Sequence, residues 1–367
     1  MSSPKVIAFY LPQYHPTEHN NEWWGEGFTE WTNVAKAKRL YPFHYQPKIP
    51  ADLGFYDLRL PEVREKQVEL AKEAGVYGFC YYHYWFSEGN EELDFPFKEV
   101  VSSKKPDFPF CLCWANESWY SKFWNKDGVA KKTLLAEQKY PGEKDNEAHF
   151  YSLLSAFKDD RYIKVDGKLL FLIYLPLQFE NFERFKTQWD ELAKNNGLEG
   201  FYFVGQTLKT SSIDEILSKG FDAVNHCHRL DDFFQYKKSM LLLRIGLYIL
   251  KRFFKFPFVI SYKKAIKRDV RPEDYRENVF PTMMPNWDHT PRSLDGGTVL
   301  HNATPQLFFK HAKDILSTAT GKSENHQIVF LKSWNEWGEG NYMEPDLKYG
   351  KGFIHALRKA LSEMTEK

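Results

Sequence analysis

The stretch that decides the fold is Leu169-Leu-Phe-Leu-Ile-Tyr174, an apolar run without the alternation of a half-exposed strand. A strand that is apolar on both faces is typical of a parallel sheet covered on both sides by helices. Similar β-branched or aromatic runs that end in polar residues recur along the chain. With this one, the predicted strands are Lys5 to Pro12, Tyr77 to Phe86, Phe108 to Glu117, Leu169 to Pro176, Gly200 to Thr207, Phe221 to Cys227, Val279 to Asp288 and Gln327 to Trp334.

Segments with helical periodicity separate these strands. In Leu60 to Ala74 and in Phe182 to Lys194, apolar or small residues recur with the spacing of an amphipathic helix. This succession of βα units predicts an α/β protein with a (β/α)₈ TIM barrel, as a single domain over residues 1–367. A doubly wound open sheet is the alternative, but no Gly-x-Gly-x-x-Gly turn follows the first predicted strand, where a nucleotide-binding sheet usually has one.

Composition excludes several classes of protein. Of the 367 residues, 43% are hydrophobic and 27% are charged, which excludes a disordered chain. The formal net charge is +1, so the basic excess of a dedicated nucleic-acid binder is absent and no nucleic-acid partner is expected. The four cysteines lack Cys-x-x-Cys spacing and the N-terminal segment lacks the apolar region of a secretory signal, which together predict a cytoplasmic protein.

Aromatic residues make up 17% of the chain, and many stand beside Asn, Asp, Glu and His. This mixture is typical of sugar-binding sites, because rings stack on the C–H faces of pyranoses while carboxylates and amides bind hydroxyls. Polar and aromatic residues also close the predicted strands, and a barrel has its active site at the carboxyl ends of its strands. Taken singly, each of these residues is more often a buried polar group or a cap than a site residue. Together they predict substrate binding by Tyr10, Tyr14, His15, His83, Trp85, Trp114, Asn116, Glu117, Tyr174, Gln206, His226, His228, Trp287, Asp288, Trp334, Asn335 and Trp337.

The segment Glu336-Trp-Gly-Glu339 is the strongest indication of catalytic residues in the sequence. Two carboxylates three residues apart face the same way only if the chain turns there, and the glycines in and after the segment favour a turn. The resulting separation suits a retaining glycosidase, whose two carboxyl groups are about 5–5.5 Å apart. We therefore predict that Glu336 and Glu339 are the catalytic pair. The alternative is a solvated acidic loop, which the flanking Trp334 and Trp337 disfavour.

Other chemistries have weaker support. His226 and His228 would point to one face of a strand, which is compatible with a metal ion, but no carboxylate or Cys at ligand spacing completes a set. A Gly-x-Ser-x-Gly elbow and a phosphate-binding Gly-rich Lys loop do not occur, which disfavours serine hydrolase and kinase chemistry. We expect neither a metal nor a cofactor.

The connection after the predicted sixth strand, at about 236–275, is an insertion of a different kind. Between Lys237 and Arg268 the chain has ten Lys or Arg and no Asp or Glu, interleaved with apolar residues. Arg244, Lys251 and Lys255 would form a basic stripe on a helix. Charges interrupt every apolar window long enough to span a bilayer. Two interpretations stay open. The helix would lie on an anionic membrane surface, making the protein peripheral on the inner membrane, or it would be a lid or dimer contact.

Six motifs give the chain a specific resemblance. They are Ala8-Phe-Tyr-Leu-Pro-Gln-Tyr-His15, Trp23-Trp-Gly-Glu-Gly-Phe-Thr-Glu-Trp-Thr-Asn33, Asp52-Leu-Gly-Phe-Tyr-Asp57, Gly78-Phe-Cys-Tyr-Tyr-His-Tyr-Trp85, Cys113-Trp-Ala-Asn-Glu117 and Ser333-Trp-Asn-Glu-Trp-Gly-Glu-Gly340. From about residue 5 to residue 360 the chain resembles the WbsX-like family of bacterial polysaccharide-biosynthesis proteins, which is related to glycoside hydrolase family 99. The resemblance implies a (β/α)₈ barrel that acts on α-mannosides with retention.

The resemblance also implies roles for the two carboxylates. Glu336 would be the base that removes the proton of the sugar 2-hydroxyl, which then attacks the anomeric carbon to give an anhydro-sugar intermediate. Glu339 would be the acid that protonates the leaving oxygen, and later the base for the acceptor. Asn116-Glu117 resembles the acid/base dipeptide of many barrel glycosidases, but we expect Glu117 to bind substrate hydroxyls.

The implied function is a glycan-active enzyme of the family 99 type, with retaining cleavage or transfer at a manno-like glycosidic bond of an oligosaccharide in bacterial surface-polysaccharide metabolism. Two alternatives stay open. One is a membrane-associated glycosyltransferase of O-antigen or capsule biosynthesis that uses a lipid-linked glycan. The other is a carbohydrate-binding barrel without catalysis, which would have no need of Glu336 and Glu339 together.

Overall fold

The structure is a computed structural model that describes residues 3–124, 130–227 and 256–365. Its centre is a closed ring of parallel strands, in which β1 pairs with both β14 and β2. The ring contains β1 (Lys5–Tyr10), β2 (Gly78–Ser87), β4 (Phe110–Trp114), β8 (Lys168–Ile173), β9 (Phe201–Thr207), β10 (Ala223–His226), β12 (Val279–Met283) and β14 (Ile328–Leu331). The predicted TIM barrel is confirmed, and each predicted strand contains or overlaps one strand of the ring.

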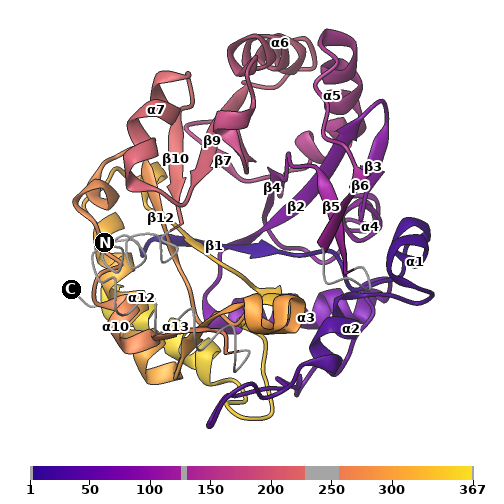
Figure 1. Cartoon of the computed structure of the whole chain (residues 1–367). Coiled ribbons are helices and arrows are strands. Elements are labelled where there is room, and N and C mark those ends of the chain that lie inside the picture. Colours follow the sequence, from indigo (N-terminus) through magenta and orange to yellow (C-terminus); the bar gives the residue numbers. More distant parts are fainter. Residues whose placement is uncertain (1–2, 125–129, 228–255, 366–367) are drawn as a thin grey trace.

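Helices surround the ring of strands (Figure 1). They are α1 (Glu18–Trp24), α2 (Glu30–Lys36), α3 (Pro61–Ala74), α4 (Phe95–Ser103), α5 (Glu143–Phe157), α6 (Phe182–Asn195), α7 (Ile213–Ser218), α10 (Tyr262–Ile266), α11 (Thr290–Ser293), α12 (Pro305–Ala319) and α13 (Gly352–Thr365). Short 3₁₀ turns are η1 (Pro176–Gln178), η2 (Thr210–Ser212), η3 (Pro272–Tyr275), η4 (Leu294–Gly296), η5 (Glu324–His326) and η6 (Trp337–Glu339). The remaining strands are β3 (Asn90–Glu92), β5 (Trp119–Trp124), β6 (Ala130–Ala136), β7 (Lys164–Val165), β11 (Phe258–Ser261), β13 (Thr298–His301), β15 (Asn335–Glu336) and β16 (Asn341–Tyr342).

Helix α3 illustrates how local sequence sets these elements. Pro61 occupies the first helical position, where its missing N–H would have no intrahelical partner. Val68 and Ala71 lie on the buried face, with the three-to-four-residue spacing that was predicted. Gly75 ends the helix with φ 83°, and a Cβ there would lie 2.7 Å from Leu361 of α13. The left-handed backbone therefore favours glycine, and a larger residue would also have to displace the Leu361 side chain of α13.

The described part of the insertion forms a small subsidiary structure beside the barrel. β11 pairs in parallel with β13, and its Ile260 joins Tyr262, Met284, Trp287 and Leu300 in a separate hydrophobic cluster. The basic stripe predicted at Arg244, Lys251 and Lys255 lies outside the described residues, so both interpretations of it stay predictions. None of the helices in the described ranges is both long and apolar enough to cross a membrane.

Four connections at the carboxyl ends of the strands build the site. They are α1 and α2 after β1, the β5–β6 hairpin after β4, α11 after β12, and the β15–η6–β16 hairpin after β14. In Figure 1, α1 and α2 lie together at one side of the barrel, next to β5. The strands of the ring hold these four connections in place, and the connections contribute most of the residues that line the pocket.

Candidate active site

The hairpin after β14 carries the predicted carboxylate pair. Glu336 is the last residue of β15, and Glu339 is the last residue of η6. The chain turns here, as predicted, because η6 winds as a 3₁₀ turn and Gly340 follows in the left-handed region at φ 54°. Both carboxylates consequently line one pocket instead of facing opposite ways.

This pocket has a volume of about 490 Å³ and opens at the carboxyl ends of the strands. Its lining combines acidic, basic and aromatic side chains, which is the mixture expected of a glycan site. The lining residues are Leu11, Gln13, Asn20, Trp24, Phe28, Glu30, Asn33, Tyr82, Tyr84, Ala115, Glu117, Ser118, Trp119, Tyr120, Leu135, Tyr174, Arg292, Lys332, Glu336 and Glu339.

Arg292 joins the two predicted catalytic carboxylates. Its Nη1 lies 2.8 Å from Glu339 Oε1 and 3.5 Å from Glu336 Oε1, while its Nε donates to Glu30 Oε2 at 3.1 Å. The sum of the first two distances is an upper limit for the separation of those two carboxylate oxygens. This limit on one pair of oxygens is compatible with the roughly 5–5.5 Å at which retaining enzymes hold their two carboxyl groups.

The charge of Arg292 is fixed by its surroundings. Burial alone would lower its pKa, but the carboxylates of Glu30, Glu339 and Glu336 outweigh burial and raise the pKa well above its ordinary value. The guanidinium therefore remains a cation and makes charge-assisted hydrogen bonds to carboxylate oxygens of Glu30 and Glu339.

A second cation lies on the other side of Glu336. Lys332 Nζ is 3.6 Å from Glu336 Oε2 and donates to the Tyr82 hydroxyl at 2.9 Å. Burial, followed by the charge of Glu336, raises the pKa of both Tyr82 and Tyr84 well above that of a free phenol. Both hydroxyls thus stay protonated and can donate hydrogen bonds to a sugar.

Two glycines allow the turn to pass between its neighbours. A Cβ on Gly338 would lie 1.8 Å from Glu30 Oε2, and a Cβ on Gly340 would lie 2.7 Å from Asp288 Cβ. On the Gly340 side, Lys48 Nζ donates to the Gly340 carbonyl at 2.9 Å. Close approach to both sides, and not turn propensity alone, explains the glycines.

A buried hydrogen-bond network supports the turn from below. The Trp337 indole N–H donates to Glu344 at 2.6 Å, and Tyr56 and Gln67 donate to the same carboxylate at 2.9 and 2.7 Å. Burial raises the pKa of Glu344 to about 7 although these hydrogen bonds lower it. Trp337 lies between the two predicted catalytic residues in sequence, so this network fixes their backbone.

The structure brings four of the predicted site residues into the pocket lining, namely Glu336, Glu339, Glu117 and Tyr174. A second group supports the turn: the Tyr14 hydroxyl accepts from the Trp337 N–H at 2.9 Å, and the Asn335 amide bonds to both backbone atoms of Leu11. Trp334 and Trp337 are fully buried beside them.

A third group of predicted residues lies next to the pocket without lining it. Asn116 donates to Tyr140 and accepts from the Leu175 N–H at 2.7 Å. The Trp114 indole donates to the Trp85 carbonyl at 2.9 Å. His83 contacts His149 at 2.7 Å, and burial lowers its pKa to about 3, so it is neutral.

Five of the remaining predicted residues lie away from the pocket. Tyr10 donates to Gln67 of α3, Gln206 donates to Asn225, and His226 pairs with Asp274 of η3 at 3.0 Å. His15 is buried beside Phe95, and Trp85 stacks on His149. His228 lies outside the described residues. Among the residues that the structure describes, no group of three or more His, Cys, Asp or Glu side chains could hold a metal ion.

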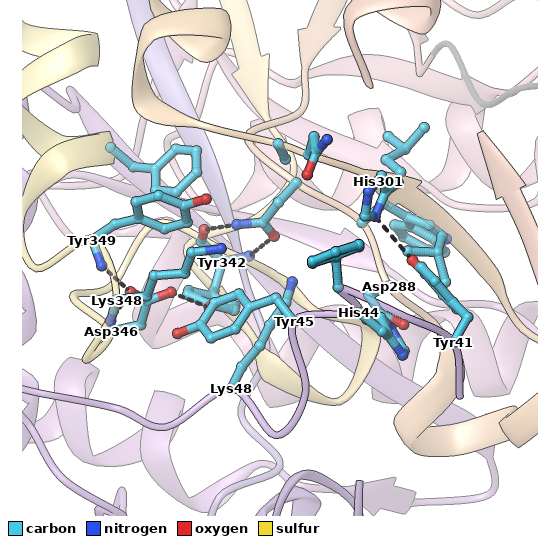
Figure 2. A pocket seen from close by; sticks show the side chains of 18 residues that line it. Tyr41, His44, Tyr45, Lys48, Asp288, His301, Tyr342, Asp346, Lys348 and Tyr349 are labelled. Atoms are coloured by element: carbon cyan, nitrogen blue, oxygen red, sulfur yellow. Dashed lines mark hydrogen bonds and ion pairs between the residues drawn. The ribbon is translucent and has the colours of Figure 1, made fainter. Parts of the chain in front are cut away.

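Trp287 and Asp288 line a different, smaller hollow of about 40 Å³ on the other side of the turn. Figure 2 shows Asp288 beside His44, whose Nε2 lies 2.8 Å from the Asp288 carboxylate. Burial would raise the pKa of Asp288, but the hydrogen bond with His44 and the charge of Lys48 lower it. This ion-paired hollow supports the turn from behind, because the Asp288 N–H also donates to the Glu339 carbonyl at 2.7 Å.

Sequence reasoning missed the two cations of the site and Glu30. Glu30 lies within the motif Trp23 to Asn33, which was used only for the resemblance. Arg292 lies on α11, beyond the polar residues that close the seventh predicted strand. Lys332 directly follows β14, where strand alternation could have indicated a side chain pointing into the barrel.

The chain is thus a (β/α)₈ barrel with a carboxylate pair in a pocket at the carboxyl ends of its strands. By structure, the chain is similar to the GH99 endo-alpha-mannosidase from Bacteroides thetaiotaomicron in complex with BIS-TRIS-Propane, with a TM-score of 0.58 and 14% identity over 100% of this chain and 99% of that one. A structure described as a glycoside hydrolase-like protein has a TM-score of 0.55 and 15% identity, and covers 98% of this chain and 94% of that one.

By sequence, residues 6–357 match the family model described as Glycosyltransferase WbsX, so the chain belongs to the WbsX family. The protein WxcX of Xanthomonas campestris pv. campestris, described as uncharacterized, is 31% identical over 363 residues, which cover 97% of this chain and 49% of WxcX. WxcX of strain B100 is 31% identical over 361 residues with the same coverage. The chain thus spans about half the length of the curated relatives it matches. The predicted family and the predicted GH99-like fold are confirmed.

Proposed function

We propose that this chain is a retaining glycan-active enzyme that cleaves or transfers a manno-like sugar, with Glu336 as base and Glu339 as acid. The observation that carries the proposal is the convergence of both carboxylates on Arg292 in a pocket at the carboxyl ends of the barrel strands. Structural similarity to a GH99 endo-alpha-mannosidase and membership of the WbsX family support the choice of sugar chemistry.

In the proposed reaction Glu336 removes the proton of the sugar 2-hydroxyl as O2 attacks the anomeric carbon. The bond from that carbon to the leaving oxygen breaks, and the leaving oxygen takes its proton from Glu339. Glu339 then removes a proton from water or from an acceptor hydroxyl, which attacks the anomeric carbon from the opposite face. In this second step the bond between O2 and the anomeric carbon breaks and O2 regains its proton from Glu336, so the two inversions leave the anomeric configuration retained.

The contact with Arg292 sets a condition on this scheme. In the free protein the guanidinium stabilises ionised Glu339, whereas the acid role needs a proton on that carboxyl group. We infer that substrate entry excludes water and brings a proton onto Glu339. Calorimetric titration in buffers of different ionisation enthalpy should therefore show proton uptake on glycan binding.

Substitution of each carboxylate tests the assignment. Glu336→Gln and Glu339→Gln should each lower kcat by about 10²–10⁴-fold, because each removes a proton-transfer group while keeping the size of the side chain. Glu69→Gln, on the exposed face of α3, is the matched control and should retain activity. Activity within tenfold of wild type in both catalytic variants would exclude the assignment. A wild type that binds glycans but never turns them over would favour the carbohydrate-binding barrel.

Hydrolysis and transfer differ in the acceptor, while a glycosidase and a nucleotide-sugar transferase differ in the donor. The purified protein should therefore be given α-mannosides and nucleotide sugars in parallel. The rival proposal, transfer to a lipid-linked glycan at the cytoplasmic face of the inner membrane, draws on the acid-free basic sequence from 237 to 268, most of which lies outside the described residues. It predicts sedimentation with anionic vesicles that falls with salt and with Gln at Arg244, Lys251 and Lys255. Equal sedimentation of both proteins would remove support for this rival.

A further inference from the structure

Helix α1 borders the pocket and is fixed to the barrel along one face. His19 forms an ion pair with Glu92 of β3. The ring of Trp23 packs edge-on against the ring of Trp119 of β5, with 5.9 Å between the ring centroids. His19 and Trp23 are four residues apart and therefore share a face of the helix. The helix is thus held in place by residues that do not line the pocket, with the exception of Trp119.

The neighbouring face of α1 is turned towards the pocket. It presents Asn20 and Trp24, which are again four residues apart, and both line the cavity. Trp24 is 43% exposed although it lies in a pocket wall. A large ring left open in a concave site is suited to stacking against the C–H face of a pyranose.

Asn20 provides an independent indication of a ligand. The residue is only 1% exposed, and within the described part of the chain neither its side-chain oxygen nor its side-chain nitrogen has a hydrogen-bond partner. A buried amide left without partners destabilises the folded protein, so such a group requires an explanation. Its one acceptor and its donor group match the donor and acceptor capacity of two adjacent sugar hydroxyls.

We propose that Asn20 and Trp24 form a sugar-binding subsite at the rim of the pocket, separate from the carboxylate pair, which takes a second pyranose ring of a neutral oligosaccharide. Trp24 stacks on the ring and the Asn20 amide binds its hydroxyls. This inference rests on the proposed glycan-active function and adds that the substrate extends beyond one ring. A purine could also stack on Trp24 and pair with an amide. The described lining residues of the pocket, however, include four carboxylates and two cations, and this balance disfavours the phosphates of a nucleotide.

The test measures binding of an α-linked mannotriose and of methyl α-mannoside by isothermal titration calorimetry. Trp24→Ala and Asn20→Leu should each weaken mannotriose binding by about tenfold or more, and should weaken binding of the one-ring glycoside by much less. Tyr151→Ala is the matched control, because Tyr151 is an exposed aromatic on α5 that does not line the pocket, and it should bind mannotriose as wild type does.

Thermal unfolding of the same variants separates binding from folding. Leucine has the branching and the number of side-chain heavy atoms of asparagine and needs no hydrogen-bond partners, so Asn20→Leu should keep or raise the unfolding temperature while it weakens binding. A lower unfolding temperature with unchanged mannotriose binding would make Asn20 a structural residue and overturn the subsite.

Two further outcomes are distinguishable. Wild-type binding of mannotriose that both α1 variants retain would overturn the subsite and leave the proposed function intact. A wild type that binds neither mannotriose nor the one-ring glycoside, but binds GDP-mannose through Trp24, would overturn the oligosaccharide subsite and favour nucleotide-sugar recognition.

Discussion

Replacing Arg292 with Gln should destabilise the protein far more than the loss of an ordinary arginine. Its side chain is 23% exposed, and its three carboxylate partners, Glu30, Glu336 and Glu339, are 4%, 7% and 10% exposed. Removing the guanidinium leaves these carboxylates close together, with Lys332 beside Glu336 and His289 beside Glu339 as the basic groups that the described residues still place there. Breaking a buried ion pair in this way is expected to lower the free energy of unfolding by about 3–5 kcal/mol.

Urea unfolding at pH 7, followed by circular dichroism, measures this change. Arg59→Gln is the matched control, because Arg59 pairs with Asp57 at 2.6 Å but is 53% exposed, and an exposed pair contributes about 0–1 kcal/mol. Arg292→Lys keeps the charge and loses the forked geometry, so its stability should fall between those of Arg292→Gln and wild type. The deficit of Arg292→Gln should shrink as the pH is lowered, because protonation removes the repulsion among the carboxylates. A deficit of Arg292→Gln no larger than that of Arg59→Gln, or independent of pH, would refute the reasoning.

Three other substitutions probe the turn and the pocket. Gly338→Ala should lower both stability and turnover, because its Cβ would lie 1.8 Å from Glu30 Oε2. Gly321→Ala, with open space around its Cβ, is the control and should be near neutral in thermal unfolding. Equal effects of the two substitutions would contradict the packing argument. Because burial raises the pKa of Glu344 to about 7, its contribution to stability is greatest below the unfolded-state pKa and is lost as the pH rises through 7. The unfolding temperature of Glu344→Gln relative to wild type should consequently rise between about pH 4.5 and pH 7, and a flat difference would argue against the shift. Glu117→Gln should mainly raise KM and leave kcat partly intact, and azide rescue of Glu117→Ala with formation of a glycosyl azide would instead make Glu117 catalytic.

The strands could be predicted because a parallel barrel strand is buried on both faces. Leu169 to Ile173 are each at most 1% exposed, and such a run needs no tertiary information to be recognised. The turn at Glu336 and Glu339 could be predicted for a similar reason, since its glycines and its paired carboxylates are local features.

The walls of the pocket could not be predicted in the same way. Arg292 reaches Glu30 across 262 positions of sequence, and no local pattern indicates which loops converge. Side chains alternate along a strand, so two adjacent polar residues can point to opposite faces although the sequence gives no sign of it. Asn225 bonds to Gln206 and to strand β12, while the adjacent His226 turns to Asp274 of η3. A polar residue at a strand end is therefore a candidate for the site only after its face is known.

The anomeric configuration of the first-formed product tests the central claim most directly. Wild-type protein would be mixed with 4-nitrophenyl α-mannoside, and the product would be followed by proton NMR before mutarotation. Glu336 and Glu339 both contact the guanidinium of Arg292, which keeps the two carboxylates close together. This geometry predicts that the product is first released, or transferred, as the α-anomer. A β-configured first product would contradict the retaining geometry and the roles assigned to Glu336 and Glu339.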